Sequence, residues 1–261
     1  MISAAREHAR HVLKRLQASL RLLWLAYPKT VECNLCGWQG RVFLSDSWHK
    51  YIMCPVCGSN TRHRLFFAVL QHNQTLSFAA LIRNKSILHF APEWSIRSRI
   101  QQLTASYKTA DFLRKNCEFK LDMSNMPEIQ DGSFDTVLAF DVLEHVPNYI
   151  AALVEIRRIL SPQGVAILTV PQKDHLPHTY EDPSIVAPEE RTRHFGQWDH
   201  LRIFGDDFPQ LVEAQGFVVT TVDATLFPLA LQARHVLCPP LRSTHPLATN
   251  FRKVFFCQKQ A

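Results

Sequence analysis

The sequence has no long apolar run, no recognisable export leader and no strong excess of one charge. No segment reaches the roughly 18 uninterrupted apolar residues that a membrane-spanning helix needs. The opening residues carry several arginines and no clean apolar core, so we expect no secretory signal. A formal charge of +6 over 261 residues permits anionic partners without indicating nucleic-acid binding by itself. We therefore expect a cytoplasmic globular protein.

Residues 1–30 predict a basic amphipathic helix. Apolar residues recur at three- and four-residue steps from Ile2 to Tyr27, arginines and lysines lie mostly off that stripe, and Pro28 ends the pattern. One interpretation is a helix that packs on its own protein or on a second copy. The other is peripheral contact with a membrane, because basic side chains beside leucines and Trp24 suit that interface.

Residues 31–64 form a small segment with four of the seven cysteines. Cys33 and Cys36 make one CxxC pair, Cys54 and Cys57 make a second, and a glycine follows each pair. Each pair bends the chain so that two thiolates face one point, and four sulfurs in a tetrahedron suit Zn²⁺. The shell is closed, so we expect a structural metal, with redox thiols or disulfides as the alternative. The segment resembles zinc ribbons.

The sequence alone does not determine what this ribbon contacts. It can pack against the rest of the chain, or it can bind RNA. Arg62, His63 and Arg64 follow the second cysteine pair directly. They can meet an anion, or they can form a solvated face.

Residues 65–261 predict an α/β domain. Helical spacing covers 65–82, and from there strand-like and helix-like segments alternate, which is typical of a parallel sheet with crossover helices. The expected strands are 86–90, 107–111, 136–140, 164–170 and 217–222, and the expected helices are 95–103, 149–160 and 210–214. A last strand over 251–258 is expected to be antiparallel at the sheet's edge. The predicted fold is a Rossmann-like, mostly parallel sheet with helices on both faces, plus the ribbon and the N-terminal helix.

The most informative stretch is FDTVLAFDVLEHV, residues 134–146. Its first half is an apolar strand long enough to be buried on both faces. Asp141, Glu144 and His145 then gather at the strand's carboxyl end. In open α/β sheets, ligands bind at that end.

These segments together resemble class I S-adenosylmethionine-dependent methyltransferases, most closely the type 11 methyltransferase domains. The resemblance covers about residues 84–222. It rests on Phe134-Asp135, on VLEHV at 142–146, and on EIRRILSPQG at 155–164. It implies S-adenosylmethionine as the cofactor and methyl transfer as the reaction.

Asp111 ends a predicted strand, where a carboxylate can accept both hydroxyls of a ribose. A helix cap or a surface acid is the alternative for Asp111. The resemblance places Asp122 beside the adenine amino group and Met123 against the adenine ring, with a plain loop acid as the alternative for Asp122. It also places Phe140 and Asp141 at the methionine end of the cofactor.

The loop after the first strand departs from the family. The family's loop is usually rich in glycine, whereas this one runs Ala91-Pro92-Glu93-Trp94. Ala91 and Glu93 stand where glycines are expected. Either the loop takes another path, with Glu93 facing the cofactor's amino group, or cofactor binding has been lost.

Residues 171–209 interrupt the alternation and are expected to form a lid over the cofactor. His194, Asp199 and His200 lie in its dense polar part and are candidate substrate or catalytic residues, with an internally hydrogen-bonded lid as the alternative. His145 is a further candidate base because histidine titrates near neutral pH, or it caps the following turn. The sequence has no HxxxH or HxH pair, so we do not expect a zinc site made of histidines alone.

Three functions are compatible with the sequence. The first is a methyltransferase for a small molecule or a sugar- or lipid-linked acceptor. The second is an RNA methyltransferase that holds RNA with its zinc ribbon. The third is a non-catalytic, zinc-stapled protein that binds a partner.

Overall fold

The computed structural model describes residues 24–114 and 116–260. The predicted helix over residues 1–30 lies mostly outside this part, so its packing and membrane contact stay predictions. Trp24 belongs to a short helical end and is about half exposed. Among the described residues, no helix is both long enough and apolar enough to cross a membrane.

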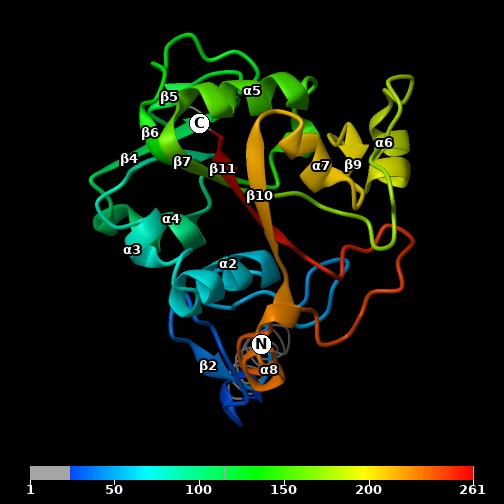
Figure 1. Cartoon of the computed structure of the whole chain (residues 1–261). Coiled ribbons are helices and arrows are strands. Elements are labelled where there is room, and N and C mark those ends of the chain that lie inside the picture. The colour runs from blue at the N-terminus through cyan, green and yellow to red at the C-terminus, as the bar shows by residue number, and fades with distance from the viewer. Residues whose placement is uncertain (1–23, 115, 261) are drawn as a thin grey trace, which may run out of the picture.

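The chain alternates strands and helices from residue 61 onward (Figure 1). The strands are β1 Val31–Glu32, β2 Gln39–Gly40, β3 Ser86–Phe90, β4 Ser106–Asp111, β5 Phe119–Lys120, β6 Phe134–Phe140, β7 Leu160–Thr169, β8 Tyr180–Glu181, β9 Arg202–Ile203, β10 Phe217–Val222 and β11 Val254–Lys259. The α-helices are α2 Thr61–His72, α3 Phe78–Leu81, α4 Trp94–Ile100, α5 Tyr149–Ile159, α6 Pro188–Phe195, α7 Phe208–Glu213 and α8 Leu229–His235. The alternation predicted from the apolar spacing is confirmed.

Seven strands form the central sheet in the order β10-β11-β7-β6-β3-β4-β5. The five strands from β7 to β5 are parallel, and β11 runs antiparallel between β7 and β10. The predicted Rossmann-like, mostly parallel sheet is therefore confirmed. The prediction that the last strand lies at the edge is wrong, because β10 takes the edge and β11 is paired on both sides.

Side chains of the central strands alternate between two hydrophobic layers. Leu88, Val137 and Leu168 face α5 and α7, while Ile87, Leu138 and Ile167 face α2, α3 and α4. A strand buried on both faces needs an uninterrupted apolar run, which is why β6 is apolar at nearly every position. Helices therefore cover both faces, with α5 on one side and α2 on the other (Figure 1).

The cysteine-rich segment packs against the same layer as α2. Its cysteines share one apolar cluster with α2 and with β3 and β11. The predicted boundary between residues 64 and 65 falls inside α2, which begins right after the second cysteine pair. The predicted helix over 65–82 is divided into α2 and α3, because Asn73 ends α2 and its side chain accepts bonds from the following turn.

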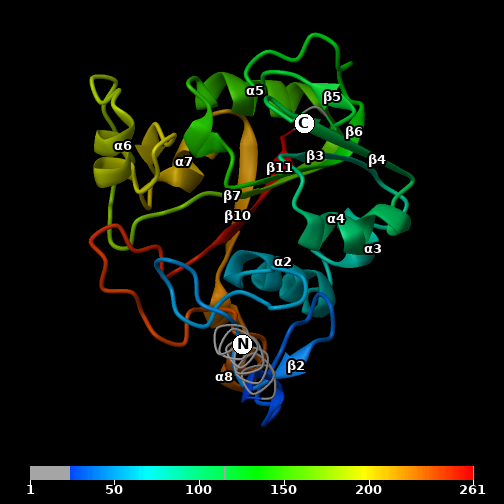
Figure 2. The same ribbon diagram turned by 180° about the vertical axis from the view of Figure 1, so that it is seen from behind.

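The helix α8, which the spacing of apolar residues did not predict, lies beside β1 and β2 in both views (Figures 1 and 2). Arg234 of α8 donates to the Glu32 carboxylate at 2.7 Å, and the His235 ring bonds the Glu32 carbonyl at 3.0 Å. The C-terminal third of the chain thus holds the cysteine-rich segment against the sheet.

Candidate functional site

The four cysteines converge in two matching turns. Gly37 and Gly58 adopt φ of 75° and 70°, and each amide donates to the carbonyl of the first cysteine of its pair. The sulfurs of Cys33 and Cys57 lie 3.6 Å apart, and those of Cys36 and Cys54 lie 3.7 Å apart. Zn–S bonds of about 2.3 Å in a tetrahedron place sulfurs about 3.8 Å apart, so the quartet fits one zinc ion.

Arg64 joins this segment to the rest of the fold. Its guanidinium is fully buried and donates to the carbonyls of Ser59, Ile52, His235 and Val236 at 2.6–3.1 Å. Burial lowers the pKa of Arg64 to about 10, and the neighbouring cysteine thiolates oppose that shift. The sequence left open that Arg62, His63 and Arg64 form a solvated face. That interpretation is wrong, because all three side chains point into the protein.

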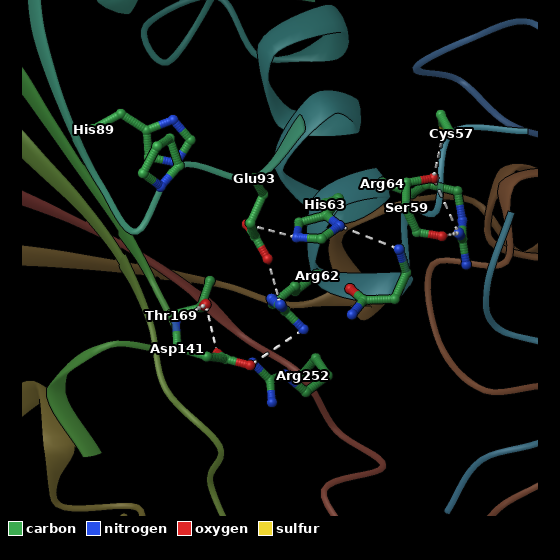
Figure 3. A network of polar contacts seen from close by, with 12 residues as sticks. Cys57, Ser59, Arg62, His63, Arg64, His89, Glu93, Asp141, Thr169 and Arg252 are labelled. Carbon is green, nitrogen blue, oxygen red and sulfur yellow. Dashed lines mark hydrogen bonds and ion pairs between the residues drawn. The ribbon is translucent and has the colours of Figure 1, made fainter. Parts of the chain in front are cut away.

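The helix α2 reaches the carboxyl ends of the strands through Arg62 (Figure 3). One Arg62 nitrogen lies 2.5 Å from Glu93, and the other lies 3.2 Å from Asp141. Arg252, which precedes β11, also pairs with Asp141, and Thr169 donates its hydroxyl to Asp141 at 2.8 Å. We call Arg62, Glu93, Asp141 and Arg252 the strand-end cluster.

His63 supports this cluster from the next position in α2. The Asn60 amide donates to its Nδ1, so the ring proton is on Nε2, which lies 2.8 Å from Glu93. Burial alone would raise the pKa of Glu93, but His63 and Arg62 lower it below its usual range. Burial likewise opposes ionisation of Asp141, and Arg252 and Arg62 lower its pKa. Both carboxylates are therefore charged at neutral pH.

The loop without glycine adopts the turn that a glycine would otherwise supply. Ala91 has φ of 45° and donates its amide to the Ala110 carbonyl at 2.9 Å. Asp141 at the end of β6 has φ of 52°. Left-handed backbone at a residue with a Cβ costs about 1–2 kcal/mol, so the two turns are held by their surroundings. The backbone bond to Ala110 holds the turn at Ala91. The turn at Asp141 has an amide bond to the Thr169 carbonyl at 2.9 Å besides its ion pairs with Arg62 and Arg252.

A cavity of about 410 Å³ opens beside the strand-end cluster. It is bordered by the end of β6, by residues 171–209 after β7 (the expected lid), by the loop of the cysteine-rich segment and by the segment before β11. Its polar lining includes Arg62, Asp141, Glu144, His145, His200 and Arg252.

Two of the four predicted catalytic residues, His145 and His200, line this cavity, and a third, Asp199, lies beside His145. The His145 and His200 rings lie 4.8 Å apart, and Asp199 lies 3.3 Å from His145 Nδ1. The Nδ1–H of His200 donates to the Phe195 carbonyl at 3.0 Å, and burial lowers the pKa of His200. His200 is therefore neutral, with Nε2 as its unprotonated nitrogen.

His194 lies elsewhere. Its Nδ1 and the Tyr180 hydroxyl are 3.2 Å apart, and the pair lines a second cavity of about 460 Å³. His194 lies within α6 and is partly exposed, whereas His200 lies in the turn after α6 and is buried. The spacing of the histidines alone did not distinguish these two positions.

The predicted adenosine-binding residues line up along the same edge of the sheet. Asp111 ends β4, and its Oδ1 accepts bonds from the amides of Leu113 and Arg114 at 2.8 and 2.9 Å. Asp122 is exposed after β5 and accepts from Ser124 at 2.8 Å. Both acids therefore brace their own loops, which for Asp122 is the alternative that the sequence left open, whereas Asp111 is mostly buried and caps none of the described helices. The other oxygen of Asp111, Oδ2, lies 3.4 Å from the exposed Arg114 guanidinium, so a ligand at Asp111 would share that oxygen with Arg114 or displace it.

Met123 and Phe140 are core residues in the structure. Met123 packs in the layer under α5, and Phe140 packs against His63, Phe66 and His89 in the other layer. Their side chains face away from solvent, so only their backbone groups can border a cofactor.

The sequence interpretation missed Arg252, a partner of Asp141 from a distance of 111 residues. It also missed Arg62 as a member of the site, although Arg62 follows the ribbon directly. The sequence places Glu144 at the strand end but assigns it no role. It is fully buried, and burial raises its pKa well above the usual range, with the Asp141 charge adding to the effect.

Two curated relatives match short parts of the chain. An uncharacterized protein of Methanocaldococcus jannaschii is 55% identical over 47 residues, which are 18% of this chain and 20% of that protein. An uncharacterized protein in a transposon of Streptomyces fradiae is 32% identical over 102 residues, which are 39% of this chain and 29% of that protein. The chain thus spans less than a third of the length of either relative.

Solved structures with a similar fold have low sequence identity. The 1,6-didemethyltoxoflavin-N1-methyltransferase of Burkholderia thailandensis, solved with S-adenosylhomocysteine, is 16% identical with a TM-score of 0.49 over 77% of this chain and 79% of that chain. The YcgJ protein of Bacillus subtilis is 12% identical with a TM-score of 0.49 over 76% of this chain and 99% of that chain.

A family model matches the α/β part of the chain. It is described as a methyltransferase domain and matches residues 65–222, more than half of the chain. The matched residues include β3 to β10, the strand-end acids Glu93 and Asp141, and the lid. The chain belongs to this methyltransferase domain family.

Proposed function

We propose that the protein transfers a methyl group from S-adenosylmethionine to a small molecule or to a sugar- or lipid-linked acceptor. The observation that carries this proposal is the cavity of about 410 Å³ at the carboxyl ends of the strands, next to the strand-end cluster. Cavities of about 300–1,000 Å³ suit small ligands. A polar cavity of this size beside the expected cofactor position suits a compact acceptor.

The residues present fit the cofactor. Bound S-adenosylmethionine supplies an activated methyl group on a sulfonium. Asp111 at the end of β4 is the acid for the ribose hydroxyls. The cluster of Arg62, Glu93 and Asp141 offers both signs of charge to the amino-acid end, which carries an ammonium and a carboxylate. Glu93 is thus proposed to contact the amino-acid end of the cofactor, and the lack of glycine in its loop does not prevent this contact.

The acceptor is proposed to lie near His145 and His200. Transfer to a hydroxyl or a protonated amine requires that a proton leave the acceptor, and the unprotonated Nε2 of His200 can receive it. Asp199 orients the His145 ring from 3.3 Å. The remaining work of the protein is to align acceptor and methyl group and to exclude water.

The four cysteines are proposed to hold one structural Zn²⁺, as their spacing allows. Free thiols in this arrangement fit a reducing compartment such as the cytoplasm. The RNA-binding alternative is less favoured, because Arg62 and Arg64 beside the ribbon are engaged inside the protein. RNA binding that falls steeply with salt would restore that alternative.

We predict that Asp111→Asn weakens binding of S-adenosylmethionine by about 10-fold, because it removes the charge that strengthens the ribose hydrogen bonds. The asparagine oxygen can still accept from the amides of Leu113 and Arg114, so the loop keeps its brace. Calorimetric titration of both proteins measures the effect. The matched control is Asp182→Asn, which removes a carboxylate with the same kind of loop bonds in the lid. Equal affinity of Asp111→Asn and wild type removes Asp111 from the site.

A further inference from the structure

Glu144, His145 and His200 bring three potential metal ligands to one wall of the cavity. One ligand atom from each residue lies within 4.8 Å of the others. Two ligands bonded to one ion at about 2.0–2.2 Å are at most about 4.4 Å apart, so small side-chain rotations bring the set to coordination distance. The three residues come from the turn after β6 and from the lid, outside the cysteine quartet.

Glu144 is a buried carboxyl group that a bound cation would stabilise. Its side chain is 1% exposed, and its Oε2 has no hydrogen-bond partner among residues 24–114 and 116–260. The two nearby arginines do not satisfy it, since Arg62 pairs with Glu93 and Asp141, and Arg252 pairs with Asp141. An unpaired buried carboxylate is costly unless it is neutralised or coordinates a metal.

The two histidines are oriented as metal-binding histidines are. His200 donates Nδ1–H to the Phe195 carbonyl at 3.0 Å, and His145 presents Nδ1 to Asp199 at 3.3 Å. A carbonyl or carboxylate partner on one ring nitrogen fixes the tautomer and leaves the other nitrogen as the ligand. Both rings can therefore offer Nε2.

The frame around the three ligands is well held. Arg202 is buried, and its guanidinium donates to the carbonyls of Leu143, Val146 and Pro147 at 2.7–3.0 Å. The Leu201 amide donates to the Glu144 carbonyl at 3.0 Å. These bonds tie the turn that carries Glu144 and His145 to the lid segment that carries His200.

We propose that Glu144, His145 and His200 bind a divalent first-row transition-metal cation whose open positions face the cavity. Two imidazoles and one carboxylate form the ligand set of such ions in catalytic sites. An acceptor oxygen or nitrogen at an open position would lose its proton more easily, and solvent water would take that proton, because the histidine nitrogens would then be ligands of the ion. This role of the ion rests on the proposed methyltransferase function, whereas cation binding itself does not.

The test counts and titrates metal in the full-length, zinc-loaded protein. Mass spectrometry after dialysis against Zn²⁺ gives the zinc content, and electron paramagnetic resonance follows Mn²⁺, which four thiolates do not favour. We expect a second bound cation in the wild type. Glu144→Gln and His200→Gln should each weaken it at least 10-fold while the zinc of the cysteines is retained. His194→Gln is the matched control, because His194 lines the other cavity.

The proposal is overturned if the wild type holds neither a second zinc nor Mn²⁺ at millimolar concentration, or if Glu144→Gln and His200→Gln bind the cation as the wild type does. Thermal unfolding of each variant shows that it is folded. Titration with S-adenosylmethionine separates the two proposals. If the protein binds the cation but not the cofactor, the cation site stands and the methyltransferase proposal fails. If it binds the cofactor but not the cation, the methyltransferase proposal stands and the cation site fails.

Discussion

Cys54→Ser is expected to release the zinc and to lower the free energy of unfolding by about 4 kcal/mol or more, in the range seen when a structural metal is lost. The segment over 31–60 has only short strands of two residues, so little besides the metal holds its turns. Its cysteines also belong to the apolar layer under the sheet, so the loss extends to α2. For a chain of this size the midpoint of thermal unfolding falls by about 10 °C.

Cys117→Ser is the matched control, because Cys117 is a partly exposed free thiol outside the quartet. It should keep one equivalent of zinc and the wild-type unfolding temperature. Zinc content by mass spectrometry and unfolding by calorimetry measure both effects. A wild-type protein that contains no zinc, or that unfolds at the same temperature with and without a chelator, contradicts the structural role of the quartet.

Arg62→Met is expected to destabilise the protein by about 3–5 kcal/mol at neutral pH, the usual cost of removing one partner from a buried ion pair. It leaves Glu93 without its closest cation and leaves Asp141 with Arg252 alone. The side chains of Arg62, Glu93 and Asp141 are each less than a quarter exposed, so water screens the pairs weakly. Binding of S-adenosylmethionine should fall as well, because Arg62 fixes the side chains of Glu93 and Asp141, which are proposed to meet the amino-acid end of the cofactor.

The loss in free energy of unfolding caused by Arg62→Met should become smaller as the pH falls from 7 towards 4. In the wild type, the pKa values of Glu93 and Asp141 are lowered, so their stabilisation is complete above the ordinary carboxylate pKa and is lost only in more acidic solution. Without Arg62 these pKa values rise, and protonation relieves the buried charge at milder pH. Denaturant unfolding at several pH values measures this.

Arg193→Met is the control for Arg62→Met. Arg193 pairs with Glu190 at 3.0 Å on the surface of α6, where both side chains are well exposed. Its replacement should change stability by less than about 1 kcal/mol at any pH, as for other surface pairs. A similar small, pH-independent effect for Arg62→Met means that the strand-end cluster does not stabilise the fold.

The parts of the fold that follow from local pattern could be predicted from the sequence. The apolar run of β6, the helical spacing of α5 and the two cysteine pairs each contain their own signal over a few residues. The carboxyl ends of parallel strands meet at one edge, so the amino-acid pattern alone places Asp111 and Asp141 there. His145 and His200 meet because the lid folds back on that edge.

The partners of the strand-end acids could not be predicted, because they depend on topology. Arg252 reaches Asp141 only because β11 inserts between β7 and β10 instead of lying at the edge. Arg62 reaches Glu93 because α2 packs under the sheet with its first turn at the strand ends. An arginine after the cysteine pairs can be either solvated or buried as far as its chemistry goes, and only the packing of α2 decides between the two.

Equilibrium dialysis of the zinc-loaded protein against the radiolabelled cofactor tests the claim that this sheet edge binds S-adenosylmethionine. We predict one equivalent bound with a Kd below about 1 mM, the upper end of usual substrate affinities. No retained label at millimolar cofactor contradicts the claim and favours a non-catalytic protein that uses the same fold to bind a partner.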